Sequence, residues 1–400
     1  MKKNRITSLT GILTLSLILA ACLSPQGGAP QTAPTVDSAS TEPAAAQADL
    51  SAVKAYAVDQ ASRMQEATAS LRAGAEKYYA AIAQIKADHP DSNPYEYLWA
   101  NHPDAAKTLL DTMRADWLEA HTHYELNEGI IAGVPSLAYY DGWLDAGAPA
   151  SEDPEAIQWT LTLADGTTLE SPGNFFHTLT EPILYGTVEK YVGLPVDLNG
   201  DGSLGLGEAL PEAEILLGAA QGLDIAAQQT LDAVNAWEPT LEDAFMAMVT
   251  MIPTMNEYFE QWKLSTFVSG NNFEGTGFIA ASRLLDVTGI LQGLDLTYDN
   301  IRPVVANADA SLDTQIDAGF TDLVTYVNNL YDQEKAGIVF SPEEADSFGT
   351  EAQDKATALA ALVAQAAAKA NIALNLDAEG WSPDAPPAIE VTVPAPAAIE

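Results

Sequence analysis

A stretch of twelve residues, 197–208, has an oxygen donor at each position that a calcium loop of the EF-hand type requires. Gly202 allows the sharp turn at the sixth position, and Gly205 leaves the ninth position to a water molecule. A Gly/Asp-rich surface turn is the simpler alternative. The predicted calcium ligands are Asp197, Asn199, Asp201, Ser203 through its carbonyl oxygen, and Glu208 through both carboxylate oxygens.

A calcium sensor needs a helix on both sides of such a loop and usually a paired second loop. Here Gly193 and Pro195 lead into the loop without a helical pattern, and the sequence contains no second loop. Calcium is therefore predicted to fasten the connection between a helix carrying His177 and Glu181 and a helix that begins near Glu208. An affinity of roughly 10⁻⁴ to 10⁻³ M would suffice outside the cell.

His177 and Glu181 form a second candidate site, because residues four apart on a helix project from the same face. An imidazole and a carboxylate at this spacing can bind a metal ion together. Pro182 follows at once and cannot donate an amide hydrogen bond, so we expect the helix to kink or restart there. The alternatives are a core histidine held by a glutamate, or a surface pair that stabilises its helix slightly.

A matching set of side chains lies on one face of the segment 117–128. Trp117, His121, Tyr124 and Glu128 follow one another at intervals of four, three and four residues, and Glu125 lies four beyond His121. Metal sites in helical bundles are commonly built from Glu and His on facing helices. The alternative is an aromatic core stripe flanked by solvated acids. The predicted metal ligands are Glu128, His177, Glu181, His121 and Glu125.

Helices must position these residues, because apolar residues recur at intervals of three and four through most of the chain. Residues 50–87 contain one glycine and no proline, which predicts one long amphipathic helix. A hairpin is expected at 158–169, where Asp165 and Gly166 form a strong turn signal. The other helices are predicted at residues 104–132, 172–191, 208–237, 241–262, 276–305, 311–331 and 342–372.

Short connections between these helices make consecutive helices antiparallel. Several segments also have helix start signals, such as Ser341 and Pro342 before two acidic residues. The predicted fold is all-α, with up-and-down helical bundles, one small hairpin and an inserted calcium loop. We expect the helical domain to span residues 50–376.

The N-terminal segment resembles a bacterial lipoprotein signal. Three basic residues precede an apolar run from Ile6 to Leu19, which is too short for a comfortable membrane span. Cys22 follows Leu-Ala-Ala, as in a lipobox, and is the predicted lipidation site after removal of residues 1–21. The alternative is ordinary signal cleavage that leaves a free thiol. Because Cys22 is the only cysteine, no disulfide is expected.

Two further segments have compositions that cannot bury enough apolar surface to fold. Residues 22–49 are rich in Pro, Ala, Ser, Thr and Gln, and we expect a disordered tether that lifts the domain off the membrane. Residues 377–400 repeat Pro and Ala, and we expect a disordered tail. The lipid anchor would make the protein an exported, membrane-anchored lipoprotein, periplasmic or on the cell surface.

The chain is strongly acidic, with 17 basic against 56 acidic residues. Removal of Lys2, Lys3 and Arg5 with the signal leaves 14 against 56, a formal net charge of −42. Such a field repels nucleic acid, which is therefore excluded as an expected partner, and it concentrates cations near any cleft. Solubility or a salty habitat explains the overall charge equally well, so only specific carboxylates can decide between these interpretations.

The chain resembles the imelysin family, which is also called peptidase M75. The resemblance lies in residues 117–128, 174–186, 289–298 and 340–349, and it spans about residues 50–376. Members of this family include periplasmic components of Efe-type iron uptake. The resemblance implies two four-helix bundles. It also implies a metal-binding Gly-x-His-x-x-Glu motif.

The motif departs from the family pattern in this sequence. His177 and Glu181 are separated by three residues rather than two, and Phe175 replaces the glycine. Alignment from Gly186 backwards matches Glu181 but puts Leu179 at the histidine position, so either an insertion keeps His177 near the site or the histidine ligand is lost. The resemblance thus implies a metal site in which Glu181 and then Glu128 are the firmest candidates.

These observations predict a lipoprotein that binds iron or another divalent cation for iron acquisition, with Ca²⁺ as a structural ion. Carboxylates with one or two imidazoles suit iron better than copper. An iron permease or haem-peroxidase partner would follow from the family resemblance. The alternatives are a metallopeptidase of M75 type and a surface interaction module with purely structural metal. Catalytic residues are not assigned, because the sequence has no His-Glu-x-x-His or Gly-x-Ser-x-Gly motif.

Overall fold

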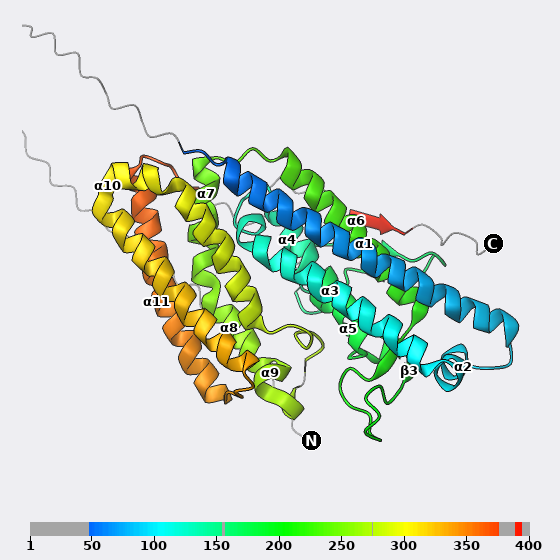
Figure 1. Cartoon of the computed structure of the whole chain (residues 1–400). Helices are drawn as coiled ribbons and strands as arrows, with labels where there is room; N and C mark the ends of the chain where they lie inside the picture. The colour runs from blue at the N-terminus through cyan, green and yellow to red at the C-terminus, as the bar shows by residue number, and fades with distance from the viewer. Residues whose placement is uncertain (1–47, 154–156, 274, 376–388, 394–400) are drawn as a thin grey trace, which may run out of the picture. The chain divides into compact units, whose positions relative to one another are not determined.

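The structure is a computed structural model that describes residues 48–153, 157–273, 275–375 and 389–393. Helices make up most of this part of the chain, which confirms the all-α prediction (Figure 1). Among the described helices, none combines the length and the apolar character that a membrane crossing requires. The predicted signal at 1–21, the lipidation site Cys22 and nearly all of the tether lie outside the described residues.

Three long helices build the N-terminal half of the described chain. Gly74 allows the first two to pack closely, because a Cβ added there would lie 2.6 Å from the side chain of Met113. A short helix between them was not predicted; the side chain of Asn93 caps its first turn. The three long helices are α1 (Ser51–Asp88), which packs against both α3 (Pro103–Ile131) and α6 (Ala213–Ala236), and the short helix is α2 (Pro94–Asn101).

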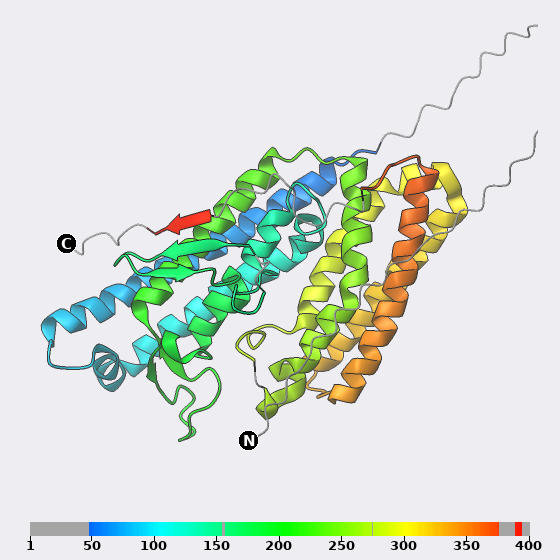
Figure 2. The same cartoon turned by 180° about the vertical axis from the view of Figure 1, so that it is seen from behind.

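The C-terminal half is a four-helix bundle (Figure 2). One side is a pair of helices separated by a 3₁₀ turn at Pro253. Two more sides come from two helices that meet at a sharp kink at Asp309, where φ is −162° and ψ is 98°, and that share the label α10. The predicted cap at Ser341 is present at the start of the last helix. The helices are α7 (Leu241–Met251), α8 (Met255–Leu264), α10 (Arg283–Lys335) and α11 (Pro342–Lys369), with the short α9 (Thr266–Ser269) after α8.

The expectation of two four-helix bundles holds for the C-terminal half only, because short elements replace a fourth long helix in the N-terminal half. In place of the helix predicted at 172–191, a π-helical turn, η1 (Phe175–Thr180), leads into α5 (Glu181–Tyr185). Gly173 has φ +99°, which is not helical, so the helix cannot begin before it. Gly186, with φ +64°, ends α5. A further short helix, α4 (Ala138–Leu144), precedes them.

The predicted hairpin is present as β1 (Trp159–Thr162) and β2 (Thr168–Glu170), with Gly166 in the turn at φ +86°. A third strand, β5 (Ile389–Thr392), pairs in parallel with β1 (Figure 2). This strand lies within the tail that we expected to be disordered. Its alternation of β-branched residues explains the difference, since Val391 and Val393 are buried.

Two helix starts differ from the prediction because extended segments precede them. The helix expected from residue 208 begins at Ala213, after the strand β4 (Ala209–Pro211), which pairs with β3 (Val192–Pro195). The helix expected from residue 276 begins at Arg283, because residues 275–281 form a loop.

Two glycines let α10 lie close against α3. A Cβ at Gly289 would lie 2.9 Å from the backbone carbon of Glu125, and a Cβ at Gly293 would lie 2.8 Å from the carbonyl oxygen of Leu126. Any other residue at either position would push the helices apart. The glycines therefore bring the first turn of α10 against the face of α3 that carries His121 and Glu125.

Candidate metal centre

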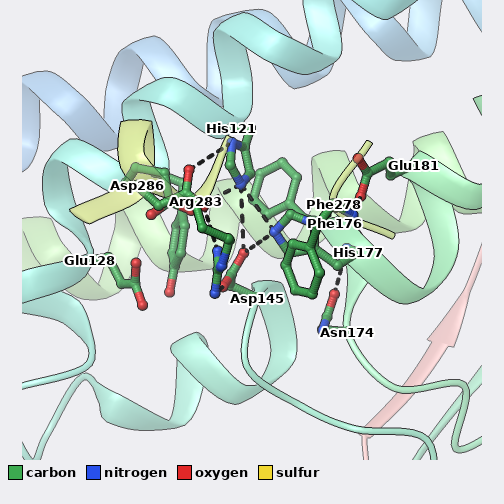
Figure 3. A network of polar contacts seen from close by, with 12 residues as sticks. His121, Glu128, Asp145, Asn174, Phe176, His177, Glu181, Phe278, Arg283 and Asp286 are labelled. Carbon is green, nitrogen blue, oxygen red and sulfur yellow. Dashed lines mark hydrogen bonds and ion pairs between the residues drawn. The ribbon is translucent and has the colours of Figure 1, made fainter. Parts of the chain in front are cut away.

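Four side chains from three parts of the fold converge in the interior. Figure 3 shows three of them, His121, Asp145 and His177. His121 and Glu125 lie one turn apart on α3, Asp145 directly follows α4, and His177 lies in the π-helical turn η1. All four side chains are buried. One nitrogen or oxygen atom from each lies within 4.8 Å of the others, as in a metal-binding site.

The distances suit a metal ion. His121 Nε2 lies 2.9 Å from Glu125 Oε1 and 3.1 Å from His177 Nε2, which itself lies 2.9 Å from Asp145 Oδ1. The distance from His121 Nε2 to Asp145 Oδ1 is 3.8 Å. A tetrahedral ion with metal–ligand distances of about 2.1 Å needs ligand atoms about 3.4 Å apart. The observed distances fall on both sides of that value, so a small movement would accommodate an ion.

One buried nitrogen of the centre has no hydrogen bond within the described part of the chain. The atom is His121 Nδ1, whose nearest acid, Asp286 Oδ1, lies 3.9 Å away. Buried polar atoms are nearly always hydrogen-bonded, and such exceptions require an explanation. The other donors of the centre contact one another, so a bound cation would replace contacts between ligands rather than fill an empty site.

Glu181 holds His177 rather than joining the four converging atoms. Its Oε2 accepts hydrogen bonds from His177 Nδ1 at 2.9 Å and from the amide of Phe278 at 2.8 Å. Its Oε1 accepts two more, each at 2.8 Å, from the amides of Ile279 and Ala280. The Nδ1–H bond fixes the tautomer that leaves His177 Nε2 available to a metal, as metal-binding histidines commonly require.

The loop that caps Glu181 also covers His177. Phe278 has φ +59°, and its ring centroid lies 4.3 Å from that of His177. A Cβ at Gly277 would lie 2.7 Å from the carbonyl oxygen of His177, so only glycine fits there. The loop therefore needs an unusual backbone to bring three amides onto one carboxylate.

The π-helical turn explains how His177 reaches the centre despite the extra residue in its motif. A π-helical turn holds more residues than an α-helical one, and such turns are frequent at functional sites. Asn174 caps it, accepting a hydrogen bond from the amide of His177 at 2.7 Å. Leu179, the alternative histidine position, is fully buried and belongs to the apolar core. Of the two alternatives, the structure thus matches an insertion that keeps His177 near the site.

Trp117 positions both histidines. Its ring stacks on His121 at a centroid distance of 4.9 Å and an interplanar angle of 9°. Its Nε1 donates a hydrogen bond of 2.8 Å to Thr180 Oγ1, in the same π-helical turn as His177. One side chain therefore ties α3 to η1 next to the converging atoms.

The two histidines have opposite protonation in the metal-free protein. Burial lowers the pKa of His121 to about 4, so this imidazole is neutral at pH 7. Burial also acts to lower the pKa of His177, but the carboxylates of Asp145 and Glu181 outweigh it and raise this pKa to about 9. His177 therefore carries a proton at pH 7 that a cation would have to replace.

The two carboxylates of the centre also differ. Burial, with repulsion from Asp286 and Asp145, raises the pKa of Glu125 well above its ordinary value. Burial acts in the same direction on Asp145, but His177 and Arg283 hold its pKa below the usual range. The metal-free centre thus pairs an ionised Asp145 with a protonated Glu125.

An ion pair at the start of α10 backs the centre. Arg283 Nη1 donates to Asp286 Oδ2 at 2.6 Å, and Asp286 Oδ1 lies 3.9 Å from His121 Nδ1. The guanidinium lies between the rings of Tyr258 and Phe278, 4.6 Å and 4.5 Å from their centroids. This cation limits the negative charge that the acids accumulate.

The structure thus places the predicted metal ligands in two groups. His121, Glu125 and His177 supply converging atoms, whereas Glu181 supports His177 and Glu128 accepts a hydrogen bond from the Tyr258 hydroxyl. Sequence reasoning missed Asp145, together with Arg283 and Asp286. Asp145 lies in no motif. The only indication in the sequence is that this acidic residue follows an apolar segment.

A cavity of about 1240 Å³ opens beside the centre, with Asp145 and His177 on its wall. It is lined by short N-terminal elements and by α7 and α8 of the C-terminal bundle. A cavity of this size exceeds what a single ion needs. The centre is therefore accessible from one side although its ligands are buried.

The predicted calcium ligands lie in an exposed loop between β3 and β4. Carboxylate oxygens of Asp197, Asp201 and Glu208 lie within 4.8 Å of one another. The Asn199 and Ser203 side chains both donate hydrogen bonds to Asp201, at 3.2 Å and 2.6 Å. Strands rather than helices flank the loop, so the connection it closes runs from α5 through this ribbon to α6.

Arg114 joins the loop to the segment that carries Glu181. Its Nη2 donates hydrogen bonds to the carbonyl oxygens of Leu184 at 2.8 Å and of Gly207 at 2.6 Å. An ordered loop therefore contributes a fixed contact to the end of α5.

The imelysin (peptidase M75) family model matches residues 189–368. The match supports the resemblance to the imelysin family. The match begins after His177 and Glu181 and includes Arg283 and Asp286, so all four converging ligands precede the matched part. No curated protein matches the chain.

Proposed function

We propose that this protein is a cell-envelope lipoprotein that binds a metal cation, with iron the foremost candidate, for metal acquisition. The observation that carries the proposal is the convergence of two imidazoles and two carboxylates in the interior. The match of residues 189–368 to the imelysin family supports a metal-related role.

The donor set favours iron or a similar cation of intermediate hardness. Imidazoles suit Fe, Zn, Ni and Cu, while carboxylates suit harder ions, and the combination in His121, His177, Glu125 and Asp145 lies between them. The centre has no thiolate or thioether among its four converging donors, which disfavours Cu(I).

An M75-type metallopeptidase is the second candidate. The cavity beside the centre favours a peptidase, because a volume of about 1240 Å³ can admit part of a peptide next to the metal. Against it, four protein donors fill a tetrahedral shell, whereas catalytic zinc usually keeps one position open. A surface interaction module with structural metal remains the third candidate, and no specific contact favours it.

The calcium loop and the lipid anchor complete the proposal. Ca²⁺ would bind Asp197, Asp201 and Glu208 and hold the β3–β4 ribbon against α5. Cys22 would carry the lipid that keeps the protein at a membrane, where an iron permease or a peroxidase could receive the metal.

Titration of metal-free protein with Fe²⁺ under anaerobic conditions tests the metal centre. We expect one tight site in the parent, and a loss of affinity of at least about 100-fold in His177→Ala. His123→Ala is the matched control, because His123 is also a buried histidine of this region but bonds to Gln60 at 2.7 Å, away from the centre. Equal affinity in the parent and His177→Ala would overturn the proposal.

A further inference from the structure

A buried arginine on the wall of the cavity approaches the metal centre. Arg283 is 4% exposed and is the first residue of α10. Its Nη2 lies 3.9 Å from Asp145 Oδ2, while the other oxygen of Asp145 lies 2.9 Å from His177 Nε2 (Figure 3). Asp145 thus lies between the guanidinium and the imidazole of His177. Arg283 can therefore act on a bound ion through its charge, without being a ligand.

The charge of Arg283 is permanent and held in place. A guanidinium is not deprotonated in proteins. The rings of Tyr258 and Phe278 lie 4.6 Å and 4.5 Å from it, and its Nε donates a hydrogen bond of 2.7 Å to the side chain of Gln261. Because these three partners carry no charge, they orient the guanidinium without neutralising it.

Asp286 supplies the opposite charge on the other side of the centre. It accepts a hydrogen bond of 2.6 Å from Arg283 Nη1, and its Oδ1 lies 3.9 Å from His121 Nδ1. Each member of this ion pair therefore approaches a different ligand of the centre, at the same distance. Loss of either member would leave the other charge uncompensated beside the ion.

An ion in the centre would interact with these charges in proportion to its own charge. Carboxylates that bind a metal are ionised and imidazoles that bind a metal are neutral, so Glu125 and Asp145 together match the charge of a divalent cation. Arg283 would repel a third charge on the ion. The charge of Glu181, which lies behind His177, is dispersed over four hydrogen bonds.

We propose that Arg283 is a selectivity residue, which makes the metal centre favour divalent over trivalent cations and favours the ferrous state of bound iron. The inference rests on the proposed function, because it concerns the ion that this centre binds. Arg283 acts on that ion across Asp145, through a buried region in which charges are only weakly screened.

The experiment compares Zn²⁺ with Ga³⁺, a trivalent ion that is not reduced under these conditions, by competition with nitrilotriacetate. Excess Ca²⁺ keeps the calcium loop from competing. The readout is the ratio of the two affinities, because a loosened centre loses affinity for both ions. Arg283→Gln should raise the ratio of Ga³⁺ to Zn²⁺ affinity roughly 10- to 100-fold. Arg283→Lys keeps the charge and should keep the ratio close to that of the parent.

Two further variants separate the effect of charge from that of packing. Asp286→Asn removes the opposite charge and should lower the ratio of Ga³⁺ to Zn²⁺ affinity. The double variant Arg283→Gln, Asp286→Asn should return the ratio toward the parent value. A packing defect does not produce shifts of opposite sign that cancel. Asp286→Asn also tests the proposal if Arg283→Gln does not fold.

Arg302→Gln is the matched control for a lost positive charge. Arg302 also lies on α10 and forms ion pairs with Asp313 and Asp317, at 3.2 Å and 2.7 Å. About 28 Å of helix separates it from Arg283. The same loss of charge at this distance should leave the ratio unchanged.

The midpoint potential of bound iron gives an independent measurement. Loss of a nearby positive charge stabilises Fe³⁺ relative to Fe²⁺, so the potential should fall in Arg283→Gln. The expected decrease is about 59 mV for each tenfold change in the affinity ratio. Arg283→Lys should keep the parent potential, and a structural defect that weakens both oxidation states equally would not move it.

The outcomes separate this inference from the proposed function. If the parent binds Zn²⁺ and Arg283→Gln has the same ratio of affinities, the role of Arg283 is overturned and the metal centre stands. Equal shifts in Arg283→Gln and in either Arg283→Lys or Arg302→Gln would also overturn it, because the local charge would not be the cause. A parent that binds neither ion, or binds both as well as His177→Ala does, would overturn the proposed function and this inference with it.

Discussion

The buried metal centre and the exposed calcium loop are both clusters of acids, but they are built in opposite ways. The loop takes Asp197, Asp201 and Glu208 from one short stretch of chain, and of these only Glu208 is buried. The centre takes Glu125, Asp145 and two histidines from separate elements and buries all of them.

Burial changes the chemistry of the same functional groups. In the loop, hydrogen bonds from Ser203 lower the pKa of Asp201, so its carboxylate stays ionised. In the centre, burial and neighbouring acids raise the pKa of Glu125 instead. The loop should therefore bind a cation without releasing protons, whereas the centre must release protons to bind one.

The largest expected difference between the two regions is their response to pH. His177 has a pKa of about 9, so below pH 9 the metal must replace its proton, and affinity should fall about tenfold for each unit of acidification. Between pH 8 and pH 5 we expect a loss of about 1,000-fold or more at the centre. Competition with a chelator of known pH dependence measures this change.

The calcium loop is the control for that experiment. Because Asp201 has a lowered pKa, calcium stabilisation of the protein should differ little between pH 8 and pH 6. A metal affinity at the centre that is independent of pH would contradict the role of His177 as a protonated ligand in the metal-free state.

A smaller effect is expected from Glu181→Gln, which removes the charge that holds His177 and accepts three amide hydrogen bonds. The imidazole of His177 is then less well oriented and less basic, so metal affinity should fall about 10- to 100-fold at pH 7. Anaerobic titration with Fe²⁺ measures the change, and Glu66→Gln is the control for a lost surface charge. Complete loss of binding would instead make Glu181 a direct ligand.

The smallest effect concerns the loop. Calcium at about 1 mM, with a dissociation constant of about 10⁻⁴ M, should stabilise the parent by about 1.4 kcal/mol. Asp197→Ala should abolish this stabilisation and leave Fe²⁺ binding at the centre unchanged. Thermal unfolding with and without calcium measures it, and a parent that does not respond to calcium would refute the structural role of the loop.

The sequence predicted the long helices well, because each buries a continuous face. The helix expected at 50–87 is α1, and the hairpin signalled by Asp165 and Gly166 is present. The predicted helix boundaries are wrong where backbone amides form hydrogen bonds outside a helix. Residues 275–281 have helix-compatible spacing, but their amides bond to Glu181, far away in sequence, so the helix starts later.

The candidate site was predictable only in part. His121, Glu125 and His177 were accessible to sequence reasoning because helical spacing puts ligands on one face. Glu181 was expected as a ligand, and its hydrogen bonds with the 278–280 amides follow from a loop conformation that no spacing reveals. Asp145 follows a short helix that was not predicted, so nothing in the sequence linked it to the histidines.

The sequence by itself determined the acidic charge, the helical class and the donors of the calcium loop, since each depends on composition or on residues that are neighbours along the chain. Only the tertiary structure decided which acids meet the histidines. Gly289 and Gly293 set the distance between α3 and α10, and the π-helical turn at His177 sets the direction of its side chain. Ligand geometry depends on those packing distances, which no local pattern records.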